Sequence, residues 1–286
     1  MSQVLAIIGG SGLYSLPELK NIQTHNVTTP FGDPSSAVIE GQIGDVKLLF
    51  IARHGEGHVL LPSEVNYRAN IFALKQLGAT HLLSISAVGS LKEEIEPGDL
   101  VIPAQYIDKT NGRKSTFFGN GIVGHVMFAH PTCPELRQLL YQRATSMQYK
   151  VHQDSTLVVM EGPAFSTRAE SNLHRSWNAD IIGMTAMPEA KLAREAELCY
   201  ATLALSTDYD CWRDDEEEVS VDVVLETFRS NVEKARKMIL ATAQSLNELQ
   251  RKCRCPKALD GAVMTQPSHI AASVTEKMAP IFGRVL

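Results

Sequence analysis

Two aspartates, Asp208 and Asp210, follow a strongly apolar stretch and are the most informative candidates for chemistry in this chain. The apolar stretch, Cys199–Ser206, has the pattern of a strand that is buried on both faces of a parallel sheet. Ligands of open α/β sheets bind where such strands end. A carboxyl group there can become partly buried, keep its proton to a higher pH and donate it to a leaving group. The alternative is that both aspartates only begin a turn, as aspartate often does.

Small or cationic residues that could hold an anion follow four other apolar stretches. Glycine lets backbone N–H groups approach an anion closely, and hydroxyl groups add donors. We expect Arg53 to offer an anion its bidentate guanidinium, and His54 to be a further donor. A surface loop or close packing would explain each place alone, but four such strand ends in one sheet would converge on one crevice. The four segments are Gly9-Gly10-Ser11-Gly12, Ala52-Arg53-His54-Gly55, Ser86-Ala87-Val88-Gly89-Ser90 and Met184-Thr185-Ala186-Met187-Pro188-Glu189.

Two familiar kinds of active site are not indicated. Two of the three residues between His54 and His58 are glycines, which argues against the zinc-binding His-Glu-x-x-His helix. A Ser-His-Asp hydrolase is poorly supported, because no Gly-x-Ser-x-Gly segment is present. We therefore expect a site without a metal ion.

The cysteines are too few and too scattered for the disulfide framework of a secreted protein, so reduced thiols are the default. Cys253-Arg254-Cys255 is a closely spaced pair near the end of the chain. A metal site would need a second such pair or a pair of histidines. We therefore expect an inert pair on the surface, with a redox or stabilising role as the alternative. The five cysteines are Cys133, Cys199, Cys211, Cys253 and Cys255.

The composition is that of a soluble globular protein. The chain has 286 residues, of which 44% are hydrophobic and 21% charged, and its net charge is −5. Because no basic block is present, we do not expect nucleic acid as a partner. The longest apolar runs fall short of the roughly 20 residues that span a bilayer, and the first residues lack a signal peptide's basic region. We expect a cytoplasmic protein with no membrane partner.

Apolar stretches alternate with helical patterns, which is typical of an α/β fold. A helix is predicted over Ser63–Leu77 with Ser63 as its N-cap, and another over Pro188–Leu198 with proline in its first turn. The clearest helix begins after Ser220 and ends near Leu246, with one apolar stripe to pack on the sheet. The predicted strands are Val4–Ile8, Lys47–Ala52, His81–Ala87, Leu100–Ile102, Thr156–Met160, Asp180–Ile182 and Cys199–Ser206.

No repeat, low-complexity tract or linker divides residues 1–250, so we expect one domain there. Residues 251–286 differ in texture. They are expected to form a C-terminal extension that reaches over a neighbouring subunit, with a loosely ordered tail as the alternative.

Several segments that occur in one order along the chain carry a family resemblance. They are Ile8-Gly9-Gly10-Ser11-Gly12-Leu13, Thr29-Pro30-Phe31-Gly32, Ala52-Arg53-His54-Gly55, Pro62-Ser63-Glu64-Val65-Asn66-Tyr67-Arg68-Ala69-Asn70, Glu161-Gly162-Pro163-x-Phe165-Ser166-Thr167-Arg168-Ala169-Glu170, Met184-Thr185-x-x-Pro188-Glu189 and Thr207-Asp208-Tyr209-Asp210-Cys211-Trp212. In these segments, across roughly residues 4–250, the chain resembles the methylthioadenosine phosphorylase branch of the purine nucleoside phosphorylase family.

The resemblance implies an α/β, single-domain phosphorylase/hydrolase-like fold with a mixed central sheet flanked by helices. It implies a homotrimer or a dimer of trimers. The implied reaction is phosphorolysis of 5′-methylthioadenosine to adenine and 5-methylthioribose 1-phosphate, a step of methionine and purine salvage. Inorganic phosphate would be a co-substrate, with no cofactor and no metal.

The resemblance also implies two sets of binding residues. The phosphate would be held by Ser11, Arg53, His54, Ser86, Ala87 and Thr185. Ser11 and Ser86 stand where many members of the family have threonine, and both keep the hydroxyl. The nucleoside would lie against Met184 at the ribose, Phe165 and Ser166 at the base, and Val221 at the base or methylthio side.

For the chemistry, the resemblance implies that Asp208 acts as the general acid at purine N7 and that Asp210 binds the exocyclic amine. His125 is similar to a histidine that an adjacent subunit lends to the methylthio pocket. The segment Leu259–Met264 is similar to a C-terminal element that covers a neighbour's site. Cys253-x-Cys255 is similar to a pair in thermophilic members that carry disulfides, although reduced thiols stay the default here.

Two alternative functions remain open at this point. The nearer one is a phosphorylase for methylthioinosine, inosine or guanosine. The Asp-Tyr-Asp segment counts against it, since a carboxylate accepts a hydrogen bond from a 6-amino purine but meets lone pairs on a 6-oxo purine. The other is a catalytically silent nucleoside-binding module, against which the phosphate-binding segments count.

Overall fold

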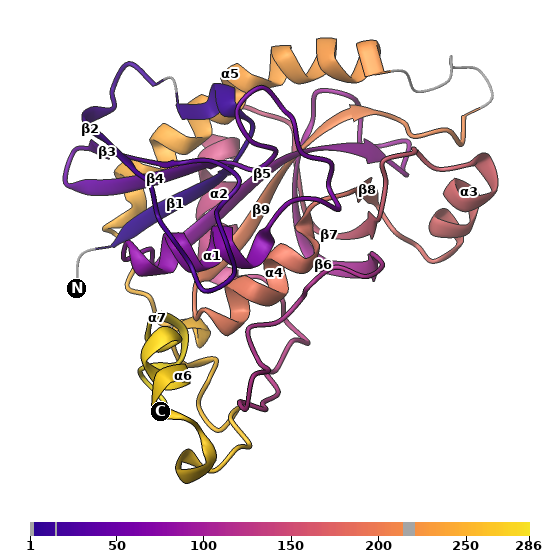
Figure 1. Cartoon of the computed structure of the whole chain (residues 1–286). Coiled ribbons are helices and arrows are strands. Elements are labelled where there is room, and N and C mark those ends of the chain that lie inside the picture. Colours follow the sequence, from indigo (N-terminus) through magenta and orange to yellow (C-terminus); the bar gives the residue numbers. More distant parts are fainter. Residues whose placement is uncertain (1–2, 15, 214–220) are drawn as a thin grey trace.

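The computed structural model describes residues 3–14, 16–213 and 221–286, and within these ranges it leaves out the side chains of residues 11, 14, 221–226 and 228–230. The strands are β1 (Val4–Gly9), β2 (Lys20–His25), β3 (Val38–Ile43), β4 (Val46–Ala52), β5 (His81–Ser90), β6 (Leu100–Lys109), β7 (Val151–Met160), β8 (Ile181–Gly183) and β9 (Cys199–Asp208). They form one mixed sheet in the order β2-β3-β4-β1-β5-β8-β7-β6-β9 (Figure 1).

Part of this sheet closes on itself. β5 pairs with β8 antiparallel, β8 with β7 and β7 with β6 parallel, and β6 returns antiparallel to β9. β9 then pairs along its length with β5 in parallel. These five strands make a closed, distorted barrel, and β5 and β9 lie at the seam that joins it to the open part of the sheet.

Helices cover both faces of the sheet. α1 (Tyr67–Gln76) and α4 (Ala186–Glu195) pack on one face, and α2 (Pro134–Ser146) and α5 (Val221–Leu246) on the other (Figure 1). α3 (Arg168–Ser176) lies at the outer end of the barrel, and the short helices α6 (Ala272–Lys277) and α7 (Ala279–Phe282) come last. The protein therefore has two apolar cores, one between each layer of helices and the sheet. The predicted α/β fold with a mixed sheet flanked by helices is confirmed.

All seven predicted strands are present, but two others were missed. β2 has an exposed, largely polar sequence, and β3 is interrupted by Gly41. Neither has the apolar pattern of a buried strand, because β2 is the edge strand of the sheet and β3, next to it, is only partly buried. α2 and α3 were also missed, although Pro134 and the capping box of Thr167 with Glu170 are recognisable signals for helix starts.

The predicted start of the first helix is wrong. α1 begins at Tyr67 rather than near Ser63, and Asn66 is its N-cap. The Asn66 side chain accepts a hydrogen bond from the backbone N–H of Ala69 at 3.2 Å, and its amide donates to the Phe31 carbonyl oxygen at 2.8 Å. Asparagine therefore caps the helix and ties it to an earlier loop, a double role that serine at position 63 does not have.

Residues 115–130 and 256–286 together form an arm that projects from the body (Figure 1). The two segments are joined by backbone hydrogen bonds, from His125 N–H to the Ala262 carbonyl at 2.9 Å and from Met264 N–H to the Val123 carbonyl at 2.8 Å. At the end of α4, buried Glu197 accepts hydrogen bonds from the arm, so the arm is anchored to the sheet layers. The extension is packed rather than loosely ordered.

The expectation of an inert cysteine pair on the surface is wrong. Cys255 is buried and Cys253 is half-buried, because both pack against Cys133 and Cys199. Among the described residues, no helix combines the length and the apolar character that crossing a membrane requires.

Candidate active site

The carboxyl ends of four strands meet at one edge of the sheet. β1 runs parallel to β4 and β5, and β5 runs parallel to β9. The backbone N–H of Arg53 donates to the Gly9 carbonyl oxygen at 2.9 Å, and Gly89 lies opposite Asp208 in the strand register. The segments that follow β1, β4, β5 and β9 are therefore neighbours, as the sequence predicts.

Arg53 is buried beneath these segments, with 2% of its surface exposed. Its Nε donates to Glu189 Oε2 at 3.0 Å and its Nη2 to Glu189 Oε1 at 3.3 Å. Nη1 donates to the Ile85 carbonyl oxygen at 2.9 Å. Nη2 also donates to the Ile8 carbonyl oxygen at 3.2 Å and to Ser84 Oγ at 2.8 Å. One guanidinium thus joins the ends of β1, β4 and β5 to α4.

The geometry of Arg53 differs from the expectation that its fork faces an anion. Burial lowers the pKa of Arg53, but the charge and hydrogen bonds of Glu189 raise it by more, so the guanidinium stays charged. The two N–H groups expected to bind an anion donate to Glu189 instead. Among the described residues, only the second N–H of Nη1 has no acceptor. The sequence does not predict that Glu189 pairs with Arg53, because the two residues are 136 positions apart.

His54 also differs from its expected role as a donor. Its Nδ1 lies 2.8 Å from the Leu60 carbonyl oxygen, which can only accept, so Nδ1 carries the proton. Burial, followed by the charge of Arg53, lowers the pKa of His54 to about 4. The ring is therefore neutral near pH 7, it stacks on His58, and its Nε2 offers a lone pair to the site.

Hydroxyl and backbone groups suited to an anion lie beside Arg53. Ser86 and Ala87 are half-buried, whereas the preceding residues of β5 are buried. β8 runs antiparallel to the end of β5, and a Cβ on Gly183 would lie 3.8 Å from the Ala87 carbonyl oxygen. Thr185 follows at once and is the N-cap of α4, yet its hydroxyl makes no capping hydrogen bond. The side chain of Ser11 lies outside the described residues.

The two aspartates form a turn and also face the same edge. Thr207 Oγ1 donates to Asp208 Oδ2 at 2.7 Å, and the backbone N–H of Asp210 donates to Asp208 Oδ1 at 2.8 Å. The second bond is an Asx turn, and Asp210 has a φ of 53°, which aspartate tolerates better than most residues. The aspartates therefore do begin a turn, and this turn fixes the direction of the Asp208 carboxyl group.

Asp210 is a half-buried acid with an unused oxygen. Burial raises the pKa of Asp210. Its Oδ2 is buried and has no hydrogen-bond partner among the described residues. A buried carboxylate oxygen without a partner is costly, so this atom is suited to receive a donor from a ligand.

Gly89 allows the two aspartates to approach β5. A Cβ at position 89 would lie 2.9 Å from Asp208 Oδ1 and 3.4 Å from the Asp210 Cβ. Any larger residue there would push the Asp208 carboxyl group away from the strand. The sequence places Gly89 in a segment predicted to bind an anion. In the structure its contacts are with the aspartates.

The residues expected at the base and ribose lie next to the aspartates. Cys211 Sγ donates to the Ser166 carbonyl oxygen at 3.1 Å, which ties the loop of Phe165 and Ser166 to the aspartate segment. Phe165 is 43% exposed and so presents an open apolar face. A Cβ on Gly162 would lie 2.6 Å from Met184 Sδ, which shows that Met184 folds over the same loop.

Arg113 holds this part of the site in place and was missed. Its Nε donates to Glu161 Oε2 at 3.0 Å and its Nη2 to the Glu161 carbonyl oxygen at 2.8 Å. Its Nη1 donates to the carbonyl oxygens of Met184 at 2.7 Å and Met187 at 2.8 Å. Arg113 lies in an Asn-Gly-Arg-Lys loop, where no sequence pattern marks a functional residue. Through the Met184 carbonyl it positions the segment that carries Thr185.

The structure does not bring His125 to the other predicted site residues, and it does not describe the side chain of Val221. His125 is exposed on the arm, which projects away from the strand ends (Figure 1). Val221 begins α5, but its side chain lies outside the described residues. A single chain therefore brings together the strand ends and the two aspartates of the candidate site without a nearby His125.

One group of described residues has the donors and spacing for a metal ion, and it lies elsewhere. The four Sγ atoms of Cys133, Cys199, Cys253 and Cys255 all lie within 4.8 Å of one another. Cys199 begins β9 and Asp208 ends it, so the cysteine group lies at the opposite edge of the sheet. The sequence shows no second pair of ligands beside Cys253 and Cys255. The fold supplies one, because Cys133 and Cys199 come from distant positions in the chain.

Comparison with known families and proteins extends these observations. The Phosphorylase superfamily model matches residues 4–244 of this chain. An S-methyl-5′-thioadenosine phosphorylase from Geobacter sulfurreducens is 49% identical over 284 residues, which are 99% of this chain and 99% of that protein. A second, from Synechocystis sp., is 49% identical over 283 residues, which are 98% of this chain and 87% of that protein.

Solved structures of methylthioadenosine phosphorylases are also similar to this chain. A methylthioadenosine phosphorylase from an antarctic soil metagenomic library superposes with a TM-score of 0.93 at 46% identity, covering 98% of this chain and 99% of that chain. The methylthioadenosine phosphorylase of Schistosoma mansoni in complex with adenine has a TM-score of 0.86 at 41% identity, covering 94% of this chain and 100% of that chain.

The first testable consequence concerns the buried ion pair. Replacing Glu189 by alanine leaves a buried guanidinium without its counter-charge, which typically costs about 3–5 kcal/mol. Denaturant unfolding at a fixed chain concentration should show a loss of this size for Glu189→Ala. The matched control is Glu233→Ala, which removes an exposed carboxylate 3.9 Å from Lys237 and should change the free energy of unfolding by about 0.5 kcal/mol or less. Equal losses in the two variants would contradict the pairing.

The second consequence concerns pH. The pKa of His54 is about 4 in the folded protein and 6.5 ordinarily, so the unfolded chain takes up this proton first as the pH falls. The contribution of neutral His54 to stability is complete above pH 6.5 and is lost as the pH falls towards 4. The difference in free energy of unfolding between the wild type and His54→Asn should therefore shrink steadily from pH 7 to pH 4.5. A difference that stays constant over this range would show that His54 is not held neutral.

Proposed function

The chain belongs to the phosphorylase superfamily, and from that premise we propose that it cleaves 5′-methylthioadenosine with inorganic phosphate. The products would be adenine and 5-methylthioribose 1-phosphate, for methionine and purine salvage. The observation that carries this proposal is the meeting of two kinds of group at one sheet edge. Hydroxyl and backbone donors lie above the buried Arg53, and the Asp208–Asp210 pair lies three residues further along β5, opposite Gly89. The relatives named S-methyl-5′-thioadenosine phosphorylase support the same substrate.

Phosphate is proposed to act both as the nucleophile and as the stabiliser of a cationic sugar. Its negative charge lies next to C1′, where positive charge develops as the glycosidic bond breaks. The donors would be Ser11, Ser86, Ala87 and Thr185, with the remaining N–H of Arg53 below them. Because neutral His54 has an acceptor at Nε2, it would receive a hydrogen bond from the protonated oxygen of hydrogenphosphate. No cofactor and no metal ion enter this reaction scheme.

Asp208 is proposed to be the general acid. A phosphate oxygen bonds to C1′, the C1′–N9 bond breaks with its electron pair moving to the purine, and Asp208 delivers a proton to N7. Thr207 and the Asp210 N–H orient its carboxyl group. The unpartnered Oδ2 of Asp210 would accept a hydrogen bond from the 6-amino group.

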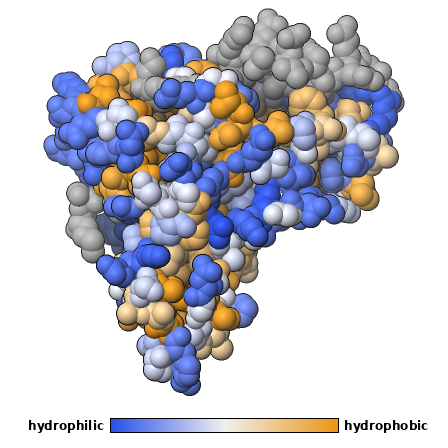
Figure 2. All heavy atoms as spheres, in the orientation of Figure 1, coloured by the Kyte–Doolittle hydropathy of each residue, from blue (hydrophilic) through white to orange (hydrophobic). Residues whose placement is uncertain are grey.

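Completion of the site by a second subunit is also proposed. Figure 2 shows apolar atoms on the surface of the arm. The arm carries large apolar side chains that a single chain leaves in water, with Val123 55%, Met127 73% and Met264 67% exposed. Apolar patches of this kind mark interaction surfaces. In a homotrimer, or a dimer of trimers, the arm would place His125 against the methylthio side of a neighbour's site.

The test of the chemistry is a substrate panel with Asp208→Asn. General acids contribute about 10²–10⁴ in rate, so this variant should lose at least 100-fold in turnover of 5′-methylthioadenosine. Asp45→Asn is the matched control on an exposed turn and should keep full activity. Turnover of Asp208→Asn close to that of the wild type would refute the assignment of the general acid.

The same panel separates the alternative functions. Adenine release from 5′-methylthioadenosine should require added phosphate, and methylthioinosine and inosine should be poor substrates. Release in water alone would identify a hydrolase, no release would identify a binding module, and a preference for 6-oxo purines would identify the other phosphorylase class.

The arm gives a separate prediction. A charge at position 264 should prevent burial of the apolar arm surface, so Met264→Glu should lower the mass measured by light scattering towards that of one chain. Ile22→Glu is the control, because Ile22 is 60% exposed on β2, outside the arm. Its mass should match the wild type. An unchanged mass for Met264→Glu would show that this part of the arm is not in the subunit interface.

A further inference from the structure

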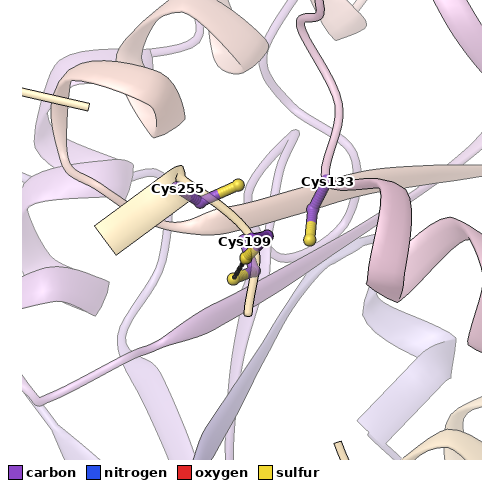
Figure 3. Close-up of side chains that lie close together, drawn as sticks. Cys133, Cys199 and Cys255 are labelled. Atoms are coloured by element: carbon purple, nitrogen blue, oxygen red, sulfur yellow. Dashed lines mark hydrogen bonds between the residues drawn. The ribbon is translucent and has the colours of Figure 1, made fainter. Parts of the chain in front are cut away.

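Four cysteines that are far apart in the sequence converge at the amino end of β9. Their Sγ atoms lie within 4.8 Å of one another, and those of Cys199 and Cys253 are 3.4 Å apart. Figure 3 shows Cys133, Cys199 and Cys255 pointing into the same space. Three of the four are buried and the fourth is half-buried. The grouping accounts for four of the five cysteines in the chain.

Elements of the fold position these thiols independently of one another. Cys133 is the residue before α2, and its backbone N–H donates to the Tyr200 carbonyl oxygen at 2.7 Å. Cys199 is the first residue of β9, and its N–H donates to the Thr80 carbonyl oxygen at 3.0 Å. Cys255 begins the 3-10 helix Cys255–Lys257. The backbone is therefore fixed by secondary structure at Cys133, Cys199 and Cys255, and the three side chains point toward one another (Figure 3).

We propose that Cys133, Cys199, Cys253 and Cys255 form a tetrahedral, four-thiolate site for a zinc ion. Zinc–sulfur bonds of about 2.3 Å place the four sulfurs of a tetrahedron about 3.8 Å apart. The observed separations, 3.4 Å between Cys199 and Cys253 and no more than 4.8 Å for any pair, lie on either side of this value, so shifts of about 1 Å or less reach that geometry. Four soft thiolates select Zn²⁺ over Mg²⁺ or Ca²⁺. Binding releases one proton from each thiol and gives a complex with two negative charges.

The charge of the surrounding segment suits such a complex. Residues 251–257 read Arg-Lys-Cys-Arg-Cys-Pro-Lys, with four cationic residues and no acid. The Nε of Arg251 is buried and has no hydrogen-bond partner among the described residues. A cation-rich segment around two thiols lowers the cost of a dianionic centre.

The site has a structural role rather than a chemical one. All four coordination positions are filled by sulfur, which leaves no place for water or substrate. β9 has 10 residues, so its two ends, at Cys199 and Asp208, are about 30 Å apart. Cys253 and Cys255 lie where the chain leaves α5 and enters the arm, so the metal would fasten the base of the arm to β9 and α2.

Metal content is the direct test. The full chain, purified under reducing conditions without chelator, should contain about one zinc per chain by elemental mass spectrometry. Cys253→Ser and Cys255→Ser should each lose most of this zinc. Cys211→Ser is the matched control, since Cys211 lies outside the group and should leave the zinc content unchanged.

Cobalt substitution keeps the test valid if a serine variant fails to fold. Wild-type protein loaded with Co²⁺ should show thiolate-to-cobalt charge-transfer absorption and the strong visible bands of a tetrahedral site. Removal of the metal should lower Tm by about 5 °C or more, because the site is preformed only in the folded chain.

Two results would overturn the proposal. One is wild-type protein with four reactive thiols, no zinc and no tetrahedral cobalt spectrum. The other is reduced-purified protein whose mass is lower by the four hydrogens that two disulfides remove. Neither result depends on the proposed phosphorolysis, so the two proposals fail separately.

Discussion

The buried ion pair between Arg53 and Glu189 is the interaction on which the candidate site depends. Arg53 follows β4, Glu189 lies on α4, and the guanidinium also binds the carbonyl oxygens of Ile8 and Ile85 at the ends of β1 and β5. A buried pair of this kind adds little net stability compared with apolar residues of the same volume. Its role is to fix positions, because one planar guanidinium group holds the ends of three strands and the start of a helix in a fixed arrangement. The donors proposed to bind phosphate follow directly from those strand ends.

β5 links the two halves of the site. Ser86 and Ala87, which are proposed to bind the anion, lie on this strand, and Gly89 lies against Asp208 and Asp210. These positions are three residues apart or less, which is about 10 Å along a strand. The separation between the proposed phosphate site and the proposed general acid is therefore set by a single strand at the seam of the barrel. Arg113 performs a similar task on the other side, since it fastens the Met184 segment to Glu161.

The sequence was sufficient for the buried part of the fold and for the residues at strand ends. Cys199–Ser206 is apolar throughout because β9 is covered on both faces, and such a strand is recognisable from its residues. The strand Lys20–His25 is not recognisable from its residues, because an exposed edge strand needs no apolar pattern. Arg53 was identified, but its partner Glu189 is 136 positions away, and no local pattern indicates which acid meets which base. The four cysteines were missed for the same reason, because their convergence is a property of the tertiary fold.

The most direct test of the central claim is a crystal structure of the chain with sulfate and adenine bound together. The account predicts one crevice, with sulfate oxygens at Thr185 and the backbone of Ser86 and Ala87, and with adenine N7 within hydrogen-bond distance of Asp208. It also predicts that the Arg53–Glu189 pair stays closed beneath the sulfate. Sulfate and adenine in separate cavities, or a sulfate that displaces Glu189 from Arg53, would contradict it.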